Sequence, residues 1–566
     1  MRILIFHGYL LSGTGSNVYT AHTARALTAL GHDVHLLCQD RHPERQPFVD
    51  AVGDWESGTL VVRELDAGDW GSRGAGEGRS RGGRCTVYRP DIGDLLPVYV
   101  ADTYEGIRAR TFADCSDGEI AGYLDANVAA AAELGALVAP QAALANHLIM
   151  GPVIVARALR GEVPYAVKIH GSALEYTVKP QPERFLDFAR EGVAGAAAVL
   201  VGSLHTAKSL WDALEDDGLR ARTRLGPPGV DVHRFGPREP AAARAGVRAL
   251  SARLREQAAR QAPPSASGPT GQPAGAGAST KFCAHTSSFA RDELAAARAL
   301  ERVEGERDRL VAFVGKLIVS KGVDLLLAAW PLVLSAAPDA RLVVVGFGAY
   351  RATLERLLAA LAAGELERAR EIARAGSSLE GAVGEALAPG ERQPEQERAL
   401  GYLLAFLDGL HGEAGERYVE SARALPERVL WTGRLEYEEV AELLPACEAL
   451  IVPSTFPESF GMVAAEAAAC AALPISAAHS GLAEVSTVLA AALPAQVASW
   501  LSFPLGAGAV AGLAQRLVAW LSADEELRAQ ARADMVATVR ERWSWEGVAR
   551  GVIAAARGEL DVLAAP

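Results

Sequence analysis

The chain has 566 residues, a length that favours two or more domains, each large enough for its own hydrophobic core. Hydrophobic residues make up 50% of it and charged residues 22%, which is a globular composition. The formal net charge of −13 argues against nucleic acid as a partner. The six cysteines are scattered and include no Cys-x-x-Cys pair, which argues against a zinc site and a disulfide framework and fits a reducing, cytoplasmic compartment.

The sequence predicts neither a secretory signal nor a transmembrane segment. Only four apolar residues separate Met1-Arg2 from His7, too few for a secretory signal. The uncharged stretch 485–515 is interrupted by Pro494 and Pro504, so we interpret it as buried elements and loops rather than a transmembrane segment.

The N-terminal half begins with a strand–helix–strand pattern. Ile3–Phe6 is a short apolar strand, Val18–Leu30 has helical apolar spacing that ends at Gly31, and Val34–Cys38 is the next strand. This βαβ start predicts a Rossmann-like domain. The later elements expected in this half are a helix at 120–134, a strand region from 137 to 146, a strand from 164 into a His170-Gly171 turn, a strand at 197–201 and a helix from 204.

The first loop carries Gly13 and Gly15, which with Thr14 nearly match a dinucleotide fingerprint, and Asp40 lies at about the distance of a ribose-binding acid. Fingerprint glycines must follow the strand directly so that the helix N-terminus meets the pyrophosphate. Here Gly13 comes seven residues after Phe6. We therefore expect this loop to shape a cleft facing another domain, and a nicotinamide oxidoreductase is the least favoured function.

A second Rossmann-like unit starts with the strand 310–315, which ends at Gly315. Its expected elements are strands at 310–315, 342–345, 429–432, 449–452 and 473–476, and helices at 323–334, 438–444, 509–521, 524–542 and 546–556. No Asp-x-Asp metal motif stands at a strand end, so no metal site is expected. Lys316 and Lys321 flank the first turn of this unit and can supply two ammonium groups to a diphosphate.

Three stretches interrupt the two units. We expect a surface loop at 66–84, a disordered insertion at about 255–290 because Pro, Ala, Ser, Gly and Thr cannot bury enough apolar surface, and a helical insertion of two to four helices at about 350–428. The charges of the last favour a solvated face first and a protein-interaction surface second. The predicted domains are 1–228, 229–542 and a C-terminal helix at 543–566 that packs back on the first domain.

The stretch 453–466 combines groups that suit a nucleotide-sugar, although taken alone it also fits a strand–turn–helix with two solvated glutamates. An apolar strand, Ala449–Val452, leads into a short loop that holds Glu458, and Glu466 lies on the following helix. Free N–H groups at a helix start attract phosphate, and carboxylates accept hydrogen bonds from sugar hydroxyls. The phosphate-facing N–H groups would be those of Ser459, Phe460, Gly461 and Met462.

The chain resembles the retaining glycosyltransferases of family 4, which have the GT-B fold. The motifs that carry the resemblance are Gly315-Lys316 with Lys321-Gly322-Val323-Asp324, Gly346-Phe347-Gly348, Gly433-Arg434-Leu435, Glu458 with Glu466, Gly481-Leu482-Ala483-Glu484-Val485, Trp543-Ser544-Trp545, Gly13-Thr14-Gly15, His170-Gly171 and Pro228-Gly229-Val230-Asp231. Their order and spacing fit over nearly the whole chain outside the insertions. The family usually has a second glycine beside the loop glycine, whereas this chain has Gly13-Thr14-Gly15.

The resemblance implies roles for several residues. Glu466 would accept the ribose hydroxyls and Glu458 the hydroxyls of the donor sugar, with front-face attack rather than a covalent intermediate on Glu458. His170, at a strand end, would donate or accept a hydrogen bond near the donor sugar. Gly13 and Gly15 would let the backbone approach the diphosphate and the acceptor. Arg434 would border the base or form an ion pair. Weaker acceptor-side candidates are Asn146, Ser172 and Tyr176, and Trp543 and Trp545 would anchor the last helix.

The expected function is therefore transfer of a sugar from a nucleotide-sugar, of the UDP-glucose or GDP-mannose type, to an unidentified hydroxyl on a sugar, glycolipid or small molecule, with no further cofactor. Two alternatives remain open. A nucleotide-sugar epimerase of the same fold would release free epimerised sugar without an acceptor. A non-catalytic scaffold would bind nucleotide without turnover, although the set of Lys316, Lys321, Glu458 and Glu466 argues against it.

Overall fold

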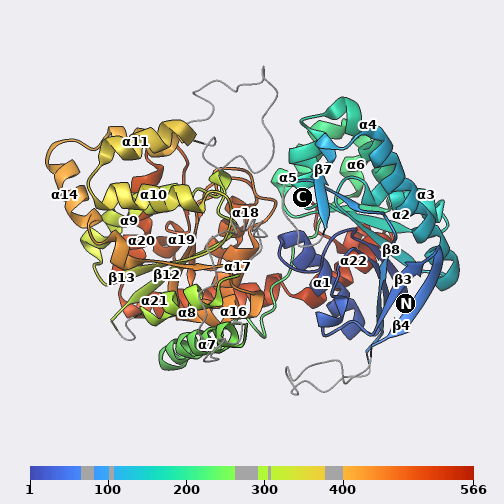
Figure 1. Cartoon of the computed structure of the whole chain (residues 1–566), viewed down its shortest axis with the longest axis horizontal. Helices are drawn as coiled ribbons and strands as arrows, with labels where there is room; N and C mark the ends of the chain where they lie inside the picture. Colours follow the sequence, from blue (N-terminus) through green and yellow to red (C-terminus); the bar gives the residue numbers. More distant parts are fainter. Residues whose placement is uncertain (66–81, 101–106, 262–290, 304–306, 377–399) are drawn as a thin grey trace, which may run out of the picture.

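The computed structural model describes residues 1–65, 82–100, 107–261, 291–303, 307–376 and 400–566. The described chain forms two lobes that lie side by side (Figure 1). Residues up to about 225 build the first lobe, and the strands from residue 309 onward build the sheet of the second.

The first lobe is organised around a nine-stranded sheet with the order β11-β10-β9-β8-β1-β2-β5-β3-β4. Its neighbouring strands pair in parallel except β3 and β4, which form an antiparallel hairpin at the edge. The strands are β1 Arg2–Phe6, β2 Asp33–Leu37, β3 Ala51–Glu56, β4 Thr59–Glu64, β5 Cys85–Arg89, β8 Ala142–Asn146, β9 Tyr165–Lys168, β10 Ala198–Val201 and β11 Thr223–Leu225. A separate parallel pair consists of β6 Leu95–Val98 and β7 Arg108–Thr111. The central strands are apolar and almost wholly buried, as expected where helices cover both faces of a parallel sheet.

The helices of this lobe are α1 Gly15–Ala29, α2 Asp117–Val138, α3 Gly151–Leu159, α4 Pro182–Ala194, α5 Leu204–Leu214 and α6 Asp217–Arg222. Two boundary predictions are wrong. The helix expected from Val18 already begins at Gly15, and Leu137 and Val138 end α2 instead of opening a strand. In the second case the helix continues until Ala139, which adopts the left-handed conformation with φ +44° and donates its N–H to the carbonyl of Gly135, so Leu137 and Val138 still belong to the last turn.

The second lobe contains a six-stranded parallel sheet with the order β14-β13-β12-β15-β16-β17. Its strands are β12 Arg309–Val314, β13 Ala340–Val345, β14 Val429–Gly433, β15 Cys447–Val452, β16 Leu473–Ala477 and β17 Ser502–Phe503. The helices that connect and cover them are α7 Pro240–Gln261, α8 Glu293–Glu301, α9 Val323–Ala336, α16 Tyr437–Leu443, α17 Met462–Ala469, α18 Ser480–Ala490, α19 Ala495–Ala498, α20 Ala509–Ser522 and α21 Glu525–Arg542.

The insertions differ from expectation in two places. Helix α7 continues to Gln261, so the start of the stretch expected to be disordered at 255–290 is helical, and residues 262–290 lie outside the described residues. Between 350 and 428 the described residues form five helices rather than two to four: α10 Arg351–Ala362, α11 Leu366–Ala375, α13 Gly401–Asp408, α14 Gly412–Ala422 and α15 Leu425–Arg428. Glycines such as Gly364, with φ +76°, divide this block into short helices. Residues 377–399, and residues 66–81 of the loop predicted at 66–84, also lie outside the described residues.

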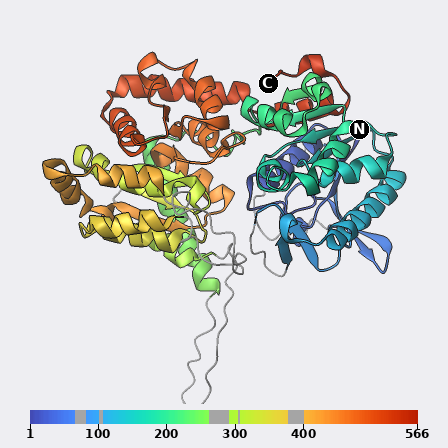
Figure 2. The same cartoon turned by 90° about the horizontal axis from the view of Figure 1, so that it is seen from above.

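The C-terminal helix α22 Trp545–Ala556 returns to the first lobe, beside α1 and β8 (Figure 1). Its small apolar residues Ala549, Val552 and Ala555 are buried in the core beneath the nine-stranded sheet. Figure 2 shows the red C-terminal end of the chain against the N-terminal lobe. The two crossings between the lobes run next to each other, because the N–H of Val230 donates to the carbonyl of Trp543 over 2.8 Å.

Two Rossmann-like units with a C-terminal helix packed on the first one define the GT-B fold, which confirms the predicted fold class. The five cysteines among the described residues are free and buried. In the part of the chain that the structure describes, no helix has both the length and the apolarity needed to cross a lipid bilayer.

Candidate functional site

The site lies where the carboxyl-end loops of the two sheets meet. In the second lobe, β12 and β15 are neighbours, so the loops that follow them lie together. The N–H of Thr455 donates to the carbonyl of Ser320 over 2.8 Å. Gly322 has φ +64°, and a Cβ there would lie 2.0 Å from the carbonyl oxygen of Pro453, so only glycine allows this approach.

Lys321 and Glu458 form an ion pair across these two loops. Glu458 also accepts a hydrogen bond of 2.7 Å from the hydroxyl of Ser454. Burial alone would raise the pKa of Glu458, but the adjacent Lys321 charge and these hydrogen bonds outweigh it and hold the pKa below its usual value. Glu458 is therefore an ionised, oriented carboxylate at neutral pH.

The backbone of Glu458 is held by the turn that opens α18. Its N–H donates to the hydroxyl of Ser480 over 2.9 Å, and its carbonyl accepts from the N–H of Gly481 over 2.9 Å. His479 shares hydrogen bonds with the Ser454 carbonyl at 2.7 Å and the Ser480 hydroxyl at 3.1 Å. Sequence reasoning missed Ser454, His479 and Ser480 as supports of Glu458; their places directly after β15 and β16 were the available signal.

Helix α17 begins at Met462, directly after Gly461, whose φ is +116°. Ser459, Phe460 and Gly461 connect Glu458 to this helix start, whose first N–H groups have no partner within the helix. Glu466, in the second turn of α17, is buried. Burial raises the pKa of Glu466 to about 7, and the neighbouring Tyr437 side chain offsets part of that increase. A buried carboxyl group of this kind gains from hydroxyl groups that hydrogen-bond to its ionised form.

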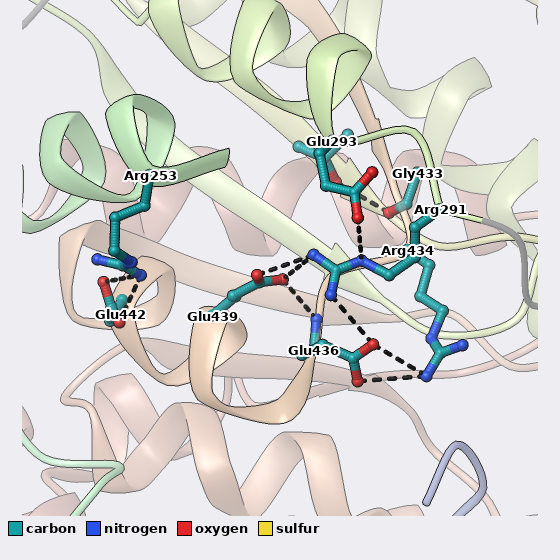
Figure 3. A network of polar contacts seen from close by, with 9 residues as sticks. Arg253, Arg291, Glu293, Gly433, Arg434, Glu436, Glu439 and Glu442 are labelled. Carbon is teal, nitrogen blue, oxygen red and sulfur yellow. Dashed lines mark hydrogen bonds and ion pairs between the residues drawn. The ribbon is translucent and has the colours of Figure 1, made fainter. Parts of the chain in front are cut away.

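Arg434 follows β14 and takes part in a network of ion pairs (Figure 3). Its guanidinium lies 3.1 Å from Glu436 and 5.9 Å from the centre of the Phe347 ring. Arg291 holds Glu436 at 3.2 Å and Glu439 at 2.8 Å from the other side. Arg434 therefore forms an ion pair, which was one of its two expected roles, and it lies at the carboxyl edge of the sheet.

Arg291 was not expected to matter. It lies just before α8, after the insertion. Figure 3 shows it between three glutamates: Glu293 of α8, Glu436 in the turn before α16, and Glu439 of α16. A second arginine, Arg253 of α7, pairs with Glu442 of α16 at 2.8 Å. The segments that flank the insertion are thereby fixed to α16, a long-range arrangement that no local pattern predicts.

Gly315 and Lys316 lie at the same carboxyl edge, in the loop after β12. The N–H of Gly315 donates to the carbonyl of Val345 over 3.0 Å, and the N–H of Leu317 donates to the carbonyl of Phe347 over 2.7 Å. These bonds draw the loops after β12 and β13 together. Lys316 is half-buried in this loop.

In the first lobe, His170 follows β9 and is partly buried. Its Nε2 is 2.8 Å from the side-chain oxygen of Asn146, and since that oxygen only accepts, the proton sits on Nε2. The ring lies 4.8 Å from that of His147 and 5.1 Å from that of Tyr19, centre to centre. Burial holds the pKa of His170 well below its ordinary value, so the imidazole is neutral at pH 7.

Two more buried histidines stand beside His170, at the carboxyl ends of β1 and β8, and sequence reasoning passed over both. His7 hydrogen-bonds with Asn17 at 3.0 Å, and burial lowers its pKa to about 4. His147 has φ +70°, and neither of its ring nitrogens has a hydrogen-bond partner among the described residues.

The predicted glycines bring the lobes together. Gly15 opens α1, and a Cβ there would lie 3.8 Å from the sulfur of Met462; Gly13, with φ +93°, shapes the preceding turn. A Cβ on Gly171 would lie 3.3 Å from the Cβ of Ser459. Of the weaker candidates, Tyr176 stacks on Phe456 across the lobes at 5.2 Å, and Ser172 is half-buried.

The two tryptophans that were expected to anchor the last helix are buried between the lobes. Trp543 packs edge-on against Phe460, with ring centres 5.4 Å apart. Trp545 stacks on His22 of α1 at 4.9 Å and lies 5.8 Å from Tyr19. Both rings thus touch residues of α1 or of the loop before α17.

Comparisons with known proteins agree with this fold. Residues 14–214 match a glycosyl transferase 4-like domain, and residues 308–376 and 402–490 match models described as glycosyl transferases group 1. The D-inositol 3-phosphate glycosyltransferase of Segniliparus rotundus is 30% identical over 273 residues, which are 48% of this chain and 44% of the relative. The match therefore spans less than half of that relative's length.

Two solved structures are similar over their whole length. Sucrose-phosphate synthase from Thermosynechococcus elongatus has a TM-score of 0.52 and 16% identity, with 99% of each chain covered. Anabaena HepE, solved in complex with UDP and glucose, has a TM-score of 0.50 and 15% identity, with 100% of each chain covered. At such identities the likeness concerns the fold alone.

The fold and the paired domains define the class: this is a GT-B glycosyltransferase. The 4-like domain in the first lobe, the group 1 matches in the second and the Segniliparus relative make the assignment narrower. The chain belongs to the glycosyltransferases of family 4 type.

Proposed function

We propose that this glycosyltransferase moves a sugar from a nucleoside diphosphate sugar to a hydroxyl acceptor, with retention of anomeric configuration and without a metal ion. The observation that carries the proposal is the Lys321–Glu458 ion pair directly before α17, with Glu466 buried in the second turn of the same helix. One helix start thus offers a cation, an ionised carboxylate and a buried carboxyl group.

In this proposal the diphosphate lies between Lys321, Lys316 and the N-terminus of α17. Two ammonium groups and the helix end would stabilise the charge that develops on the leaving diphosphate. Lys321 would then pair with phosphate, which leaves the oriented Glu458 carboxylate for the hydroxyls of the sugar. Glu466 would accept the ribose hydroxyls, whose hydrogen bonds offset the burial of its charge.

Retention follows in this proposal from front-face attack. The bond between the anomeric carbon and the phosphate oxygen breaks, the bond to the acceptor oxygen forms on the same face, and the acceptor proton passes to the departing phosphate oxygen. Glu458 orients the sugar and forms no covalent bond. His170 is neutral and its Nε2–H donates to the side-chain oxygen of Asn146, so its proposed role is to accept a hydrogen bond from the sugar at Nδ1, and not to donate a proton.

The donor is proposed to be of the UDP-glucose or GDP-mannose type. UDP and glucose in the HepE complex are consistent with the first of these. The acceptor is a hydroxyl of a sugar, a glycolipid or a small molecule. Because the Segniliparus relative is named for an inositol phosphate, such a cyclitol belongs in the acceptor panel.

A binding screen followed by product analysis tests the proposal. Calorimetry with UDP-, GDP- and ADP-sugars should show one preferred donor, which raises the stability of the folded protein by RT ln(1 + L/Kd), where L is the free donor concentration. NMR of the product should show the anomeric configuration of the donor, with the rate unchanged by EDTA. An inverted product would refute retention, and loss of activity in EDTA with recovery in Mg²⁺ would refute metal independence. Free epimerised sugar without acceptor would identify an epimerase instead.

A further inference from the structure

The two lobes are joined by a carboxylate that reaches from one to the other. Glu484 lies on α18 of the second lobe, and its two oxygens accept hydrogen bonds from the backbone N–H groups of Leu204 and His205 on α5 of the first lobe. The distances are 2.8 Å from the N–H of Leu204 and 2.9 Å from that of His205.

These N–H groups are the first two of α5, which begins at Leu204. The first donors of a helix have no partner within the helix, and this end carries a partial positive charge. The next donor, the N–H of Thr206, is capped within the first lobe by the hydroxyl of Ser203 at 3.2 Å. Glu484, from the second lobe, thus accepts from the two N–H groups that the Ser203 cap does not bind, and both hydrogen bonds are charge-assisted.

The helix that carries Glu484 also holds the donor-side loop. Ser480 and Gly481, at the start of α18, bind the N–H and the carbonyl of Glu458. The next residue of that loop, Ser459, lies against Gly202 of the first lobe, where a Cβ would come 2.5 Å from its carbonyl oxygen. The first five residues of α18 therefore bind the start of α5 through Glu484 and also hold the backbone of Glu458 through Ser480 and Gly481. Ser459, the residue after Glu458, contacts the first lobe.

We propose that Glu484 is a positioning residue for sugar transfer: it holds the lobes closed, so that the His170-Gly171 turn faces the Glu458 loop, and it couples closure to the orientation of Glu458. This inference rests on the proposed function. It assigns Glu484 no contact with donor or acceptor, so its loss should lower kcat and leave donor affinity nearly unchanged.

The test compares Glu484→Ala and Glu484→Gln in the full chain, with Glu413→Gln as a control. Glu413 is an exposed glutamate of α14 whose partner is Arg417, one helical turn away. Loss of charge-assisted bonds should lower kcat of the alanine variant about tenfold or more. The glutamine variant keeps one oxygen acceptor and should fall between it and wild type. Small-angle X-ray scattering with UDP or GDP present should show a larger radius of gyration for the alanine variant, while the control matches wild type.

Gly202→Ala tests the closure from the other lobe. Gly202 has no left-handed φ, so alanine fits the backbone, but its methyl group would press on the Ser459 carbonyl. This variant should show the same open scattering profile and reduced kcat. The double variant with Glu484→Ala should lose less than the two single losses added together, because both act on one contact.

Wild-type kcat and radius of gyration in Glu484→Ala would overturn the proposal, as would a reduced kcat with an unchanged scattering profile. If the alanine variant does not fold, the glutamine variant and Gly202→Ala decide in the same way. If the wild-type protein transfers no sugar, the proposed function fails, whereas the scattering comparison still decides whether Glu484 holds the lobes together.

Discussion

Replacing Glu466 by glutamine separates what this carboxyl group costs in stability from what it contributes to binding. Burial raises its pKa from 4.5 to about 7. Between these two values the folded protein holds a proton that the unfolded chain has released. By linkage, the contribution of Glu466 to stability is fully present below pH 4.5 and is lost as the pH rises to about 7. At about 1.4 kcal/mol for each pH unit, the loss amounts to about 3 kcal/mol.

Glutamine has nearly the same shape and no charge, so Glu466→Gln should remove this pH dependence. At pH 5 the two proteins should unfold at nearly the same temperature. At pH 8.5 the variant should be the more stable one, by about 6 °C at roughly 2 °C per kcal/mol for a domain of this size. Its affinity for UDP or GDP should fall at least tenfold, because an amide replaces one acceptor oxygen for the ribose hydroxyls.

The assay is a thermal melt of both proteins at intervals from pH 5 to 8.5, with titration calorimetry of the nucleotide at pH 8. The difference between the two melting temperatures cancels the contributions of other ionisable groups. A difference that stays constant over this range would refute the assignment of a buried, ionising carboxyl group at Glu466. A variant that gains stability and binds nucleotide like wild type would refute its proposed contact with the ribose.

Three further predictions concern the surroundings of the site. Lys321→Ala should lower kcat/KM by about 10²- to 10³-fold, since it removes a cation from the leaving diphosphate. It should also raise the pKa of Glu458, which would shift the acid limb of the pH–rate profile to higher pH. An unchanged rate would refute the role of Lys321. Arg291→Ala removes one of the two arginines that pair with Glu436, the other being Arg434, and should therefore raise the KM for the donor with little change in kcat. A fall in kcat as large as the rise in KM would contradict an indirect effect through Arg434. Trp545→Ala should cost about 3–5 kcal/mol in stability, measured by denaturant unfolding, and a loss below about 1 kcal/mol would show that α22 is held without this ring.

The order of elements could be predicted because it depends on local apolar patterns. Runs such as Ile3–Phe6 and Ala449–Val452 are long enough to bury and short enough to be strands, and they alternate with helical spacing. The errors fell at boundaries that depend on a residue with a left-handed backbone, as at Ala139 and Gly364, and at the number of helices in the second insertion.

The individual site residues were predicted from motifs, and their roles remain predictions. The structure adds which of them touch: Lys321 is bonded to Glu458, Gly15 approaches Met462, and Gly171 approaches Ser459. It also adds supports that no spacing in the sequence indicates, because each joins residues from separate strands or lobes.

The sequence by itself determined the class of this protein: two βαβ units, glycines where the backbone must turn sharply, and charged residues placed directly after strands. Those features act over a few residues, so they can be recognised in the linear chain. Only the tertiary structure decided that Glu466 is buried with a raised pKa, that Arg291 holds Glu436, and that Glu484 caps a helix 280 positions away. Burial, pKa and contacts between lobes depend on how distant segments pack, and packing brings together residues whose separation along the chain carries no information about their distance in space.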